Sequence, residues 1–427
     1  CLSACAVVLA VWSGCGSGDD GDPLCDNGVL DPGETCDPPE SCPTSCDDGD
    51  ECTADSRTGR ARDCNVVCTN DPIIDCTGGD GCCPEGCDTS TDPDCPPDTF
   101  PRLVVVDEAG VMIWNNADLI TGDRAPDATL GGLTGRGLGL AVHHDRLFVA
   151  SDDALSPVFI YDGASTLEDG STNDETIPVS AFGDSALATI HAMEPDGSGN
   201  LWVGYGYIRL FMDADSLTSS SSSRARYIHE WGDQIFSMAY DEEGGKLLGG
   251  QVSGAGVIVW DAPLSLSGES NEPDWTLHDG FTPTAMAIHA DRLYVGSNLA
   301  PFLNIWYSIS SQSSPAAPDV SLSELSDVRH IHSRGSTLVL TMQDFTASHA
   351  IAIFLDVASI TSGSTPDVEI MHEDMELPWK AHLTRSGDLY VMDLSGILVF
   401  ADATTSPTLR VHITTDLSSP NDMLLME

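Results

Sequence analysis

Short apolar runs separated by glycine, proline and acidic residues follow one another from about residue 100 to residue 427. Their length and their content of Val, Ile, Leu and aromatic residues are typical of buried β-strands. One type of run ends in an aromatic residue and recurs every 46 to 50 residues, which indicates seven repeats of one unit. The runs are "VMIW", "VFIY", "IRLF", "VIVW", "LNIW", "IAIF" and "ILVF", ending at Trp114, Tyr161, Phe211, Trp260, Trp306, Phe354 and Phe400.

Each repeat contains three further strands around this aromatic marker. A strand of the type "RLYV" precedes the marker and starts at Leu103, Leu147, Leu201, Leu247, Leu293, Leu338 and Leu389. The fourth strand follows a longer loop and often begins after Pro-Asp, as in "APDATL" and "EPDWTL", because both residues favour turns. Four short strands repeated seven times predict an all-β fold, a seven-bladed β-propeller whose four-stranded blades bury their faces against one another.

The two ends of the repeat region predict how the ring closes. The region begins with a second strand, "RLVVVD" (102–107), and the sequence ends with "NDMLLME" (421–427), which aligns with first strands. We therefore expect the C-terminal strand to become the innermost strand of a blade whose other three strands come from the start of the region. Such closure leaves no exposed end of the array.

The stretch "GLAVHHDRLFVAS", followed by "VFIYDGA", resembles the NHL-type and related six- or seven-bladed propellers of exported bacterial proteins. The resemblance covers about three-quarters of the chain. It implies the propeller fold, but it implies no particular activity, because propellers serve binding, scaffolding and enzymatic functions alike.

The first quarter of the chain has a different chemistry. All fifteen cysteines lie at or before Cys95, in a segment rich in Asp, Gly and Pro that lacks the apolar residues of an ordinary core. "CDNGVLDPGETCD" (25–37) resembles the repeat of the myxococcal cysteine-rich modules, with "GDGCCPEGC" (79–87) as a companion element; the resemblance implies export and surface display. We therefore divide the chain into an export signal (1–15), an acidic disulfide-stapled stalk (16–98) and a propeller (99–427).

The apolar run "LSACAVVLAVW" has the length of a signal-peptide core and is too short to span a bilayer. "VWSGC" resembles a bacterial lipobox with Cys15 as the lipidated residue, although Trp12 stands where that family usually has Leu. "LSAC", ending at Cys5, is a competing match, but it places the apolar run after the lipidated residue. The sequence thus predicts an exported lipoprotein at the outer membrane or cell surface, or otherwise a secreted protein.

Lipidation of Cys15 leaves twelve cysteines, an even number that suits an oxidised module. Zinc is the rival explanation for closely spaced pairs such as Cys64 and Cys68. Adjacent cysteines and the export signal favour disulfides, with the pairing left open. The predicted disulfide cysteines are Cys25, Cys36, Cys42, Cys46, Cys52, Cys64, Cys68, Cys76, Cys82, Cys83, Cys87 and Cys95.

The formal net charge of −50, from 67 acidic and 17 basic residues, excludes nucleic acid as a partner because such a field repels phosphate. Contact with a membrane is then expected through the lipid anchor only, and the protein is expected to be a monomer. Acidic loops containing Asp47, Asp48 and Asp50, or Asp88, Asp92 and Asp94, are compatible with Ca²⁺. Solvated acidic loops explain them more simply, and no cofactor is predicted.

A histidine recurs near the end of the first strands. Our alignment of the repeats places His143, His191, Tyr240, His289, His332, Leu383 and Met426 at one position. Four imidazoles facing the channel suit a metal, but a turn residue that bonds local backbone explains the position better. In the best-matched repeat Ala290 stands at the position of His144. If either histidine of the pair has a function that the repeat itself does not require, we therefore expect it to be His144.

The loops that join fourth strands to first strands carry aromatic residues beside carboxylates at the expected channel mouth. Such a mixture suits a sugar, a peptide or a cation, whereas burial between blades is the alternative for each aromatic residue. The possible binding face consists of Phe182, Asp184, Trp231, Asp233, Phe281, Asp327, Glu376, Trp379 and Asp422. Arg136, Arg329 and Lys380 also fall near the channel and suit an anion, or salt bridges to nearby acids.

These patterns favour a propeller that acts as a binding or display module for an unknown protein, peptide or glycan. Serine-nucleophile, HExxH, phosphate-loop and dinucleotide motifs are absent from the sequence, so no catalytic residue is predicted. The alternative is a metal-dependent hydrolase similar to the gluconolactonase-like propellers, which hold a divalent ion in the channel. Asp184, Asp233, Glu376 and Asp422 are the residues available for that ion, but they do not match that family's motif residue by residue.

Overall fold

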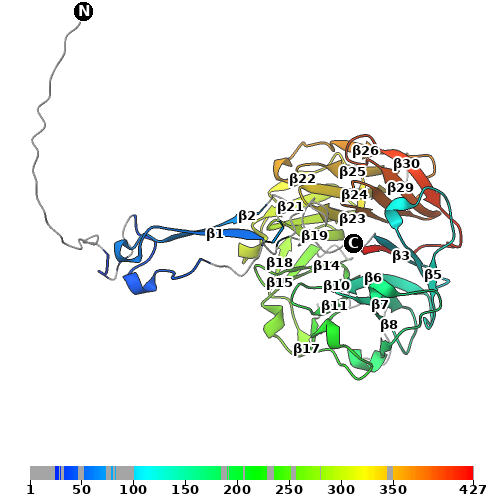
Figure 1. Ribbon diagram of the computed structural model, residues 1–427, viewed down its shortest axis with the longest axis horizontal. Coiled ribbons are helices and arrows are strands. Elements are labelled where there is room, and N and C mark those ends of the chain that lie inside the picture. The colour runs from blue at the N-terminus through cyan, green and yellow to red at the C-terminus, as the bar shows by residue number, and fades with distance from the viewer. Residues whose placement is uncertain are drawn as a thin grey trace, which may run out of the picture. The chain divides into compact units, whose positions relative to one another are not determined.

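The computed structural model divides the chain into two compact units, Cys1–Asp98 and Thr99–Glu427 (Figure 1). It describes residues 25–27, 29, 33–46, 52–73, 78–79, 82, 101–183, 190, 192–204, 207–227, 235–251, 256–278, 280–343 and 350–426. Within these residues, no helix has both the length and the apolar character needed to cross a membrane.

The N-terminal unit is held mainly by disulfides. Its regular structure is an antiparallel hairpin of β1 (Thr53–Thr58) and β2 (Val67–Pro72), with the 3₁₀ turns η1 (Pro39–Ser41) and η2 (Ala61–Asp63). The bonded pairs are Cys25–Cys64, Cys36–Cys42, Cys46–Cys68 and Cys52–Cys82. Disulfides are therefore confirmed here, and the zinc alternative for Cys64 and Cys68 is wrong because neither is a free thiolate. Cys15, Cys76, Cys83, Cys87, Cys95 and the acidic loops of Asp47 to Asp50 and Asp88 to Asp94 lie outside the described residues.

The second unit is an all-β, seven-bladed propeller, as the sequence predicts. Each blade is a meander whose first strand is innermost, and the seven innermost strands surround the centre of the ring in Figure 1. Blade 1 contains β31 (Asp422–Met426), β3 (Arg102–Val106), β4 (Val111–Trp114) and β5 (Ala128–Leu130); blade 2 contains β6 (Gly137–His143), β7 (Arg146–Ser151), β8 (Val158–Asp162) and β9 (Glu175–Ile177); blade 3 contains β10 (Ala192–Pro195), β11 (Leu201–Gly204), β12 (Ile208–Phe211) and β13 (Ala225–Tyr227). Blade 4 contains β14 (Ile235–Asp241), β15 (Lys246–Gln251), β16 (Gly256–Asp261) and β18 (Trp275–His278); blade 5 contains β19 (Pro283–His289), β20 (Arg292–Ser297), β21 (Leu303–Tyr307) and β22 (Val320–Leu322). Blade 6 contains β23 (Asp327–Arg334), β24 (Thr337–Gln343), β25 (Ala350–Phe354) and β26 (Val368–Ile370); blade 7 contains β27 (Lys380–Leu383), β28 (Leu389–Asp393), β29 (Gly396–Ala401) and β30 (Thr408–Ile413). We number these blades 1 to 7 in this order.

Short elements complete the blades. β17 (Gly268–Asn271), from the long loop of blade 4, pairs in parallel with β13 and adds a fifth strand to blade 3. Single 3₁₀ turns follow the third or fourth strands. They are η3 (Ala117–Leu119), η4 (Ala164–Thr166), η5 (Val179–Phe182), η6 (Ala214–Ser216), η7 (Pro263–Ser265), η8 (Ile309–Ser311) and η9 (Val357–Ser359).

The C-terminal strand closes the ring, as predicted. β31 pairs antiparallel with β3 from Arg102↔Met426 to Val106↔Asp422, and so becomes the innermost strand of blade 1. Asp422 extends this closure to both neighbouring blades. Its carboxylate accepts a hydrogen bond from the Leu140 backbone N–H of blade 2 at 2.7 Å and one from the Lys380 Nζ of blade 7 at 2.5 Å.

The aspartate before the fourth strand, which follows proline in four of five blades and Asn173 in blade 2, has a repeated structural role. In five blades its carboxylate accepts the backbone N–H of the residue that follows the third-strand aromatic marker, while its own N–H bonds that strand, so it fixes the start of the fourth strand. The carboxylate distances are 2.7 to 2.8 Å, for Asn115–Asp127, Asp162–Asp174, Asp261–Asp274, Tyr307–Asp319 and Leu355–Asp367.

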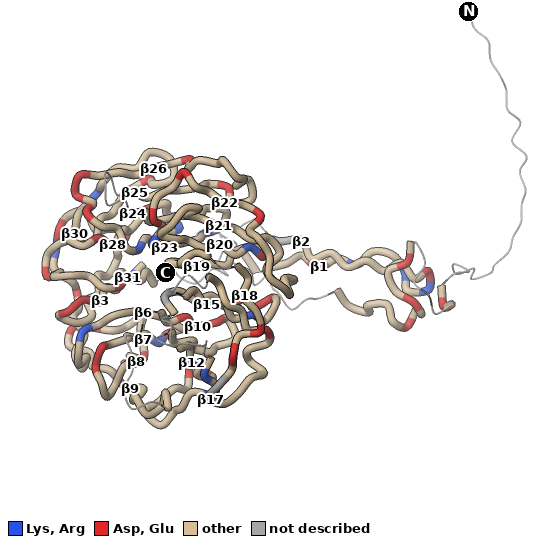
Figure 2. The backbone as a smooth tube through the Cα atoms, turned by 180° about the vertical axis from the view of Figure 1, so that it is seen from behind, with Lys and Arg blue, Asp and Glu red and all other residues tan. Residues whose placement is uncertain are grey.

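A basic residue at the start of the second strand clamps each of four blades to the next. Arg102, Arg146, Lys246 and Arg292 each donate to a carbonyl of the 3₁₀ turn in the following blade. Arg102 is 9% exposed and bonds Ala164 O at 2.5 Å, Leu167 O, and Asn115 Oδ1 at 2.7 Å. Figure 2 shows acidic residues spread over the outer loops of the propeller. The clamps use four of the 17 basic residues in the chain.

Deletion of residues 421–427 should abolish the cooperative thermal transition of the propeller. The deletion removes the innermost strand of blade 1 and the Asp422 link to blades 2 and 7, and it exposes the buried strand β3. Circular dichroism or calorimetry measures this transition. A melting curve identical to that of the intact chain would show that the ring does not depend on β31.

Replacement of Arg102 by Met should lower the free energy of unfolding by about 2–4 kcal/mol, because it leaves two buried carbonyl groups without their donor. Arg136→Met is the matched control. Arg136 is 58% exposed and pairs with Asp152 and Glu108 at the surface, so its loss should have a much smaller effect. Denaturant unfolding of the two variants provides the comparison, and equal losses would contradict the role of the clamp.

Candidate functional site

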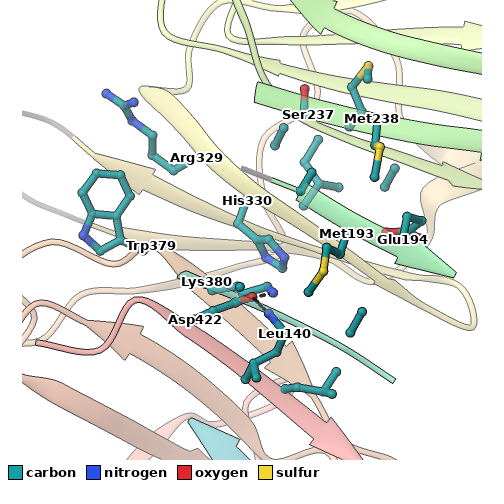
Figure 3. Close-up of a pocket in the computed structure, with 18 of the residues that line it drawn as sticks. Leu140, Met193, Glu194, Ser237, Met238, Arg329, His330, Trp379, Lys380 and Asp422 are labelled. Carbon is teal, nitrogen blue, oxygen red and sulfur yellow. Dashed lines mark hydrogen bonds and ion pairs between the residues drawn. The ribbon is translucent and has the colours of Figure 1, made fainter. Parts of the chain in front are cut away.

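A central channel of about 910 Å³ runs between the innermost strands and is lined by residues of all seven blades. Figure 3 shows part of its wall, with the side chains of Met193 and Met238 on one side and those of Arg329, His330 and Lys380 on the other. Leu140 and Met286 extend the apolar part. The channel is therefore lined by polar and apolar groups in comparable measure.

The strand registers show which side chains occupy equivalent levels. At one level lie His330, Lys380 and Asp422, which pair with Thr341, Met392 and Val106 of their second strands. The other four blades place Gly139, Ala192, Ser237 and Ala285 there. Two residues further along each strand lie His332, His382 and Glu194, with Ala141, Ala239, Ala287 and Leu424 in the remaining blades. Ionisable residues at these two levels therefore gather on the adjacent blades 6, 7 and 1, with Glu194 contributed by blade 3.

The polar side chains reach from each blade to the next. The Ala381 N–H donates to His330 Nδ1 at 3.3 Å, and Lys380 donates to Asp422. The rings of His332 and His382 lie 4.9 Å apart, edge to face. These contacts orient the imidazoles and hold three blades in register.

Burial keeps His330, His332 and His382 neutral. Desolvation lowers the pKa of His332 to about 4 and the pKa values of His330 and His382 well below their ordinary value, and nearby Lys380 lowers all three further. His332 and His382 each hydrogen-bond a backbone carbonyl, of Leu383 and Met423 respectively, but their buried Nε2 atoms make no hydrogen bond. Both Nε2 atoms are buried, so they are not exposed to a ligand in the channel.

Glu194 is the acidic group of the channel. Its side chain is accessible to channel water but lies deep inside the ring, so desolvation raises the pKa of its carboxyl to about 7, although Lys380 opposes the shift. A carboxyl that titrates near neutral pH exchanges protons readily with a bound molecule, which is the property of a general base.

Arg329 and Trp379 stand together on the channel wall (Figure 3). The Arg329 guanidinium lies 5.8 Å from the Trp379 ring centroid and pairs with Asp327, while Trp379 is 42% exposed. Desolvation raises the pKa of Asp327, and Arg329 partly offsets this shift. An accessible indole beside a planar cation offers a stacking surface and hydrogen-bond donors.

The predicted binding face is only partly assembled. Trp379 and Asp422 line the channel, and Asp327 adjoins it through Arg329. Phe182 and Phe281 are buried and pack against Phe211 and Trp306. Glu376 is exposed outside the channel lining, and its backbone N–H donates to Asp393. Asp184, Trp231 and Asp233 lie outside the described residues.

The expected alignment of the first-strand histidines is wrong in four blades, and in blade 3 the position expected for His191 is held by Asp196. The structural equivalents of His143 and His289 are Asp196, Asp241, Arg334, Thr384 and Met426. Tyr240 and Leu383 precede that position by one residue, because the first-to-second turns of their blades are longer than those of blades 2 and 5. His332 precedes it by two, although its turn has the same length as theirs. His191 lies outside the described residues.

The same misalignment hid the channel histidines. "HIH" (330–332) and "KAH" (380–382) are equivalent segments of neighbouring blades, so His330 corresponds to Lys380 and His332 to His382. The sequence alignment placed His332 opposite Leu383, and a shift by one residue would have revealed the match. Arg329 and Lys380 are both paired with acids, whereas Arg136 lies on the surface away from the channel lining.

The sequence offered four carboxylates to a channel metal, and the described residues do not bring them together as ligands of one ion. Asp422 is occupied by Lys380 and the Leu140 N–H, and Glu376 does not line the channel. The other two, Asp184 and Asp233, lie outside the described residues. The described channel residues therefore provide no basis for a mechanism through a metal.

No protein-family model and no curated protein matches the chain. Among solved structures, the propeller is similar to a candidate 6-phosphogluconolactonase from Bacteroides fragilis, with 12% identity over 77% of this chain and 99% of that chain and a TM-score of 0.57. A second candidate 6-phosphogluconolactonase, from Bacteroides uniformis, shows 11% identity over 77% and 100% of the two chains, with a TM-score of 0.53. At such identity these similarities show the shared fold alone.

Glu194 should make the stability of the propeller depend on pH. Its pKa rises from the ordinary 4.5 to about 7 on folding, so its contribution to the free energy of unfolding falls as pH rises through that window. His332 acts in the opposite sense, because its lowered pKa removes stability as pH falls from 6.5 towards about 4. Glu194→Gln should therefore gain stability relative to the unsubstituted protein as pH rises from 4.5 to 7. Urea unfolding at several pH values measures this difference, and a difference independent of pH would contradict the assignment.

Proposed function

We propose that this protein is exported and that its propeller is a binding module whose channel receives the end of a glycan. The observation that carries this proposal is the pairing of exposed Trp379 with Arg329 on the wall of a channel large enough for a small ligand. The apolar face of a sugar ring stacks on an indole, and a guanidinium donates to its hydroxyl groups. His330, further along the same wall, offers another polar contact (Figure 3).

The charge of the chain favours a neutral sugar over an acidic ligand. A net charge of −50 repels anions at long range, and the nearby cations Arg329 and Lys380 are already paired with Asp327 and Asp422. A neutral glycan pays no such electrostatic penalty on approach.

Export is supported by the four disulfides, which persist in oxidising compartments outside the cytoplasm. We further propose that Cys15, in the lipobox-like "VWSGC", is acylated and anchors the protein at the outer membrane or cell surface, with the acidic segment 16–98 as a stalk. Mass spectrometry of the N-terminal peptide from native cells would reveal the acyl group.

Hydrolysis of a lactone is the second candidate function. It is favoured by Glu194, whose near-neutral pKa suits a base that activates water, with neutral imidazoles and Lys380 nearby. Turnover in a panel of lactones and esters that disappears in Glu194→Gln would favour this enzyme over a binding module.

Titration calorimetry with neutral oligosaccharides, the matching uronic acids and short peptides tests the binding function. Trp379→Ala should weaken glycan binding at least about tenfold, because stacking contributes on the order of 1 kcal/mol or more. Leu299→Ala, which truncates a surface side chain with 59% exposure outside the channel lining, is the control and should leave binding unchanged. Binding of peptides without sugars, or equal effects of the two substitutions, would overturn the glycan proposal.

A further inference from the structure

Two adjacent histidines and an aspartate converge where blade 2 meets blade 3, and none of the three lines the channel. His143 ends β6, His144 begins the turn into β7, and Asp215 lies in the η6 turn of blade 3. One ligand-type atom from each residue lies within 4.8 Å of the other two. The cluster is therefore built from two blades that meet in space, not from one sequence motif.

The distances between these atoms suit a single metal ion. His144 Nδ1 lies 3.0 Å from Asp215 Oδ2, and His143 Nε2 lies 3.8 Å from Asp215 Oδ1. In a tetrahedral site with bonds of about 2.0–2.1 Å, ligand atoms stand about 3.3 Å apart. Small side-chain adjustments would therefore bring all three atoms to bonding distance of one ion.

His143 supplies the observation that a surface ion pair does not explain. Its side chain is only 9% exposed, and its buried Nε2 atom makes no hydrogen bond. A buried polar atom without a partner costs free energy, and here that atom faces the Asp215 carboxylate. Coordination of a cation between the two groups would satisfy it.

The surrounding structure holds the ligands in place. Arg146 donates to Ala214 O at 2.5 Å and to Leu217 O at 2.9 Å, which fixes the turn that carries Asp215. Arg146 is itself neutralised by Asp162 at 2.5 Å, so its charge does not oppose a cation. Rigid support of this kind is what a metal site requires of its neighbours.

His144 is not needed to form the turn in which it lies. The equivalent turn in blade 5 carries Ala290, which has the same left-handed backbone, φ 48° at both positions. Asp145 and Asp291, the next residues, perform the shared structural role by accepting a backbone N–H from η4 and η8. The imidazole at 144 is therefore free to serve as a ligand, and it lies 4.0 Å from the His143 ring.

We propose that His143, His144 and Asp215 bind one divalent transition-metal ion, with zinc as the ion that best suits the set. Imidazole nitrogens favour zinc, copper and nickel over calcium and magnesium, which prefer oxygen ligands. Three protein ligands leave a fourth position for water, because His144 and Asp215 are 72% and 51% exposed. The ion would fasten blade 2 to blade 3 beside the Arg146 clamp, and this role is independent of any ligand in the channel.

Zinc binding to the full chain, after treatment with a chelator and exhaustive dialysis, tests the proposal. We expect one tightly bound zinc per chain and a rise in the thermal midpoint with added zinc. His144→Ala and Asp215→Asn change exposed side chains and should weaken this binding by more than the roughly 10- to 100-fold that loss of an outer-shell partner costs. His289→Ala, at the equivalent of position 143 but with Ala290 beside it, is the matched control and should bind as the unsubstituted protein does.

Substitution by Co²⁺ gives an independent readout, because its visible absorption distinguishes four-coordinate from six-coordinate sites. An intense four-coordinate spectrum that is lost in His144→Ala and retained in His289→Ala would support the assignment. Absence of tight zinc from the unsubstituted protein, or equal zinc content in His144→Ala, Asp215→Asn and His289→Ala, would overturn it.

Discussion

The pairing of β31 with β3 is the interaction on which the propeller depends. Each blade has only four short strands and buries its two faces against neighbouring blades, so no blade has a complete core by itself. The hydrophobic clusters accordingly mix residues of consecutive blades, as where Leu103 and Trp114 of blade 1 pack with Tyr390 and Val399 of blade 7. Pairing of strands from opposite ends of the sequence closes the ring and makes this packing continuous.

Asp422 joins this closure to the chemistry of the channel. It lies on the closing strand, and its carboxylate contacts the backbone of blade 2 and the ammonium of Lys380 in blade 7. The residues that give the channel its polarity therefore also hold the ring together, so a ligand that disturbs the Lys380 pair acts on the closure itself. This coupling follows from building a site on the innermost strands, where each side chain reaches a neighbouring blade.

The distribution of positive charge shows how so acidic a chain remains compact. Only 17 basic residues oppose 67 acidic ones, and four of the basic residues are placed at equivalent interblade clamps. Buried cations that donate to turn carbonyls contribute more than exposed ion pairs, since water does not compete for the same groups. Many acidic groups lie on outer loops, where water screens their repulsion (Figure 2).

The sequence by itself determined the fold, because the aromatic marker and the second-strand leucine repeat at nearly constant spacing and every blade obeys the same packing rule. It also predicted that 421–427 close the ring and that the N-terminal cysteines form disulfides. The channel site was decided by tertiary structure. The first-to-second turns of blades 4 and 7 are longer than those of blades 2 and 5, so counting along the sequence misplaced Tyr240 and Leu383 by one residue. The pattern of histidines misplaced His332 by two residues in a turn of ordinary length, and these errors concealed the equivalence of His330 with Lys380. The meeting of His143 and His144 with Asp215, about 70 residues away, likewise depends on the contact between blades, which no local pattern records.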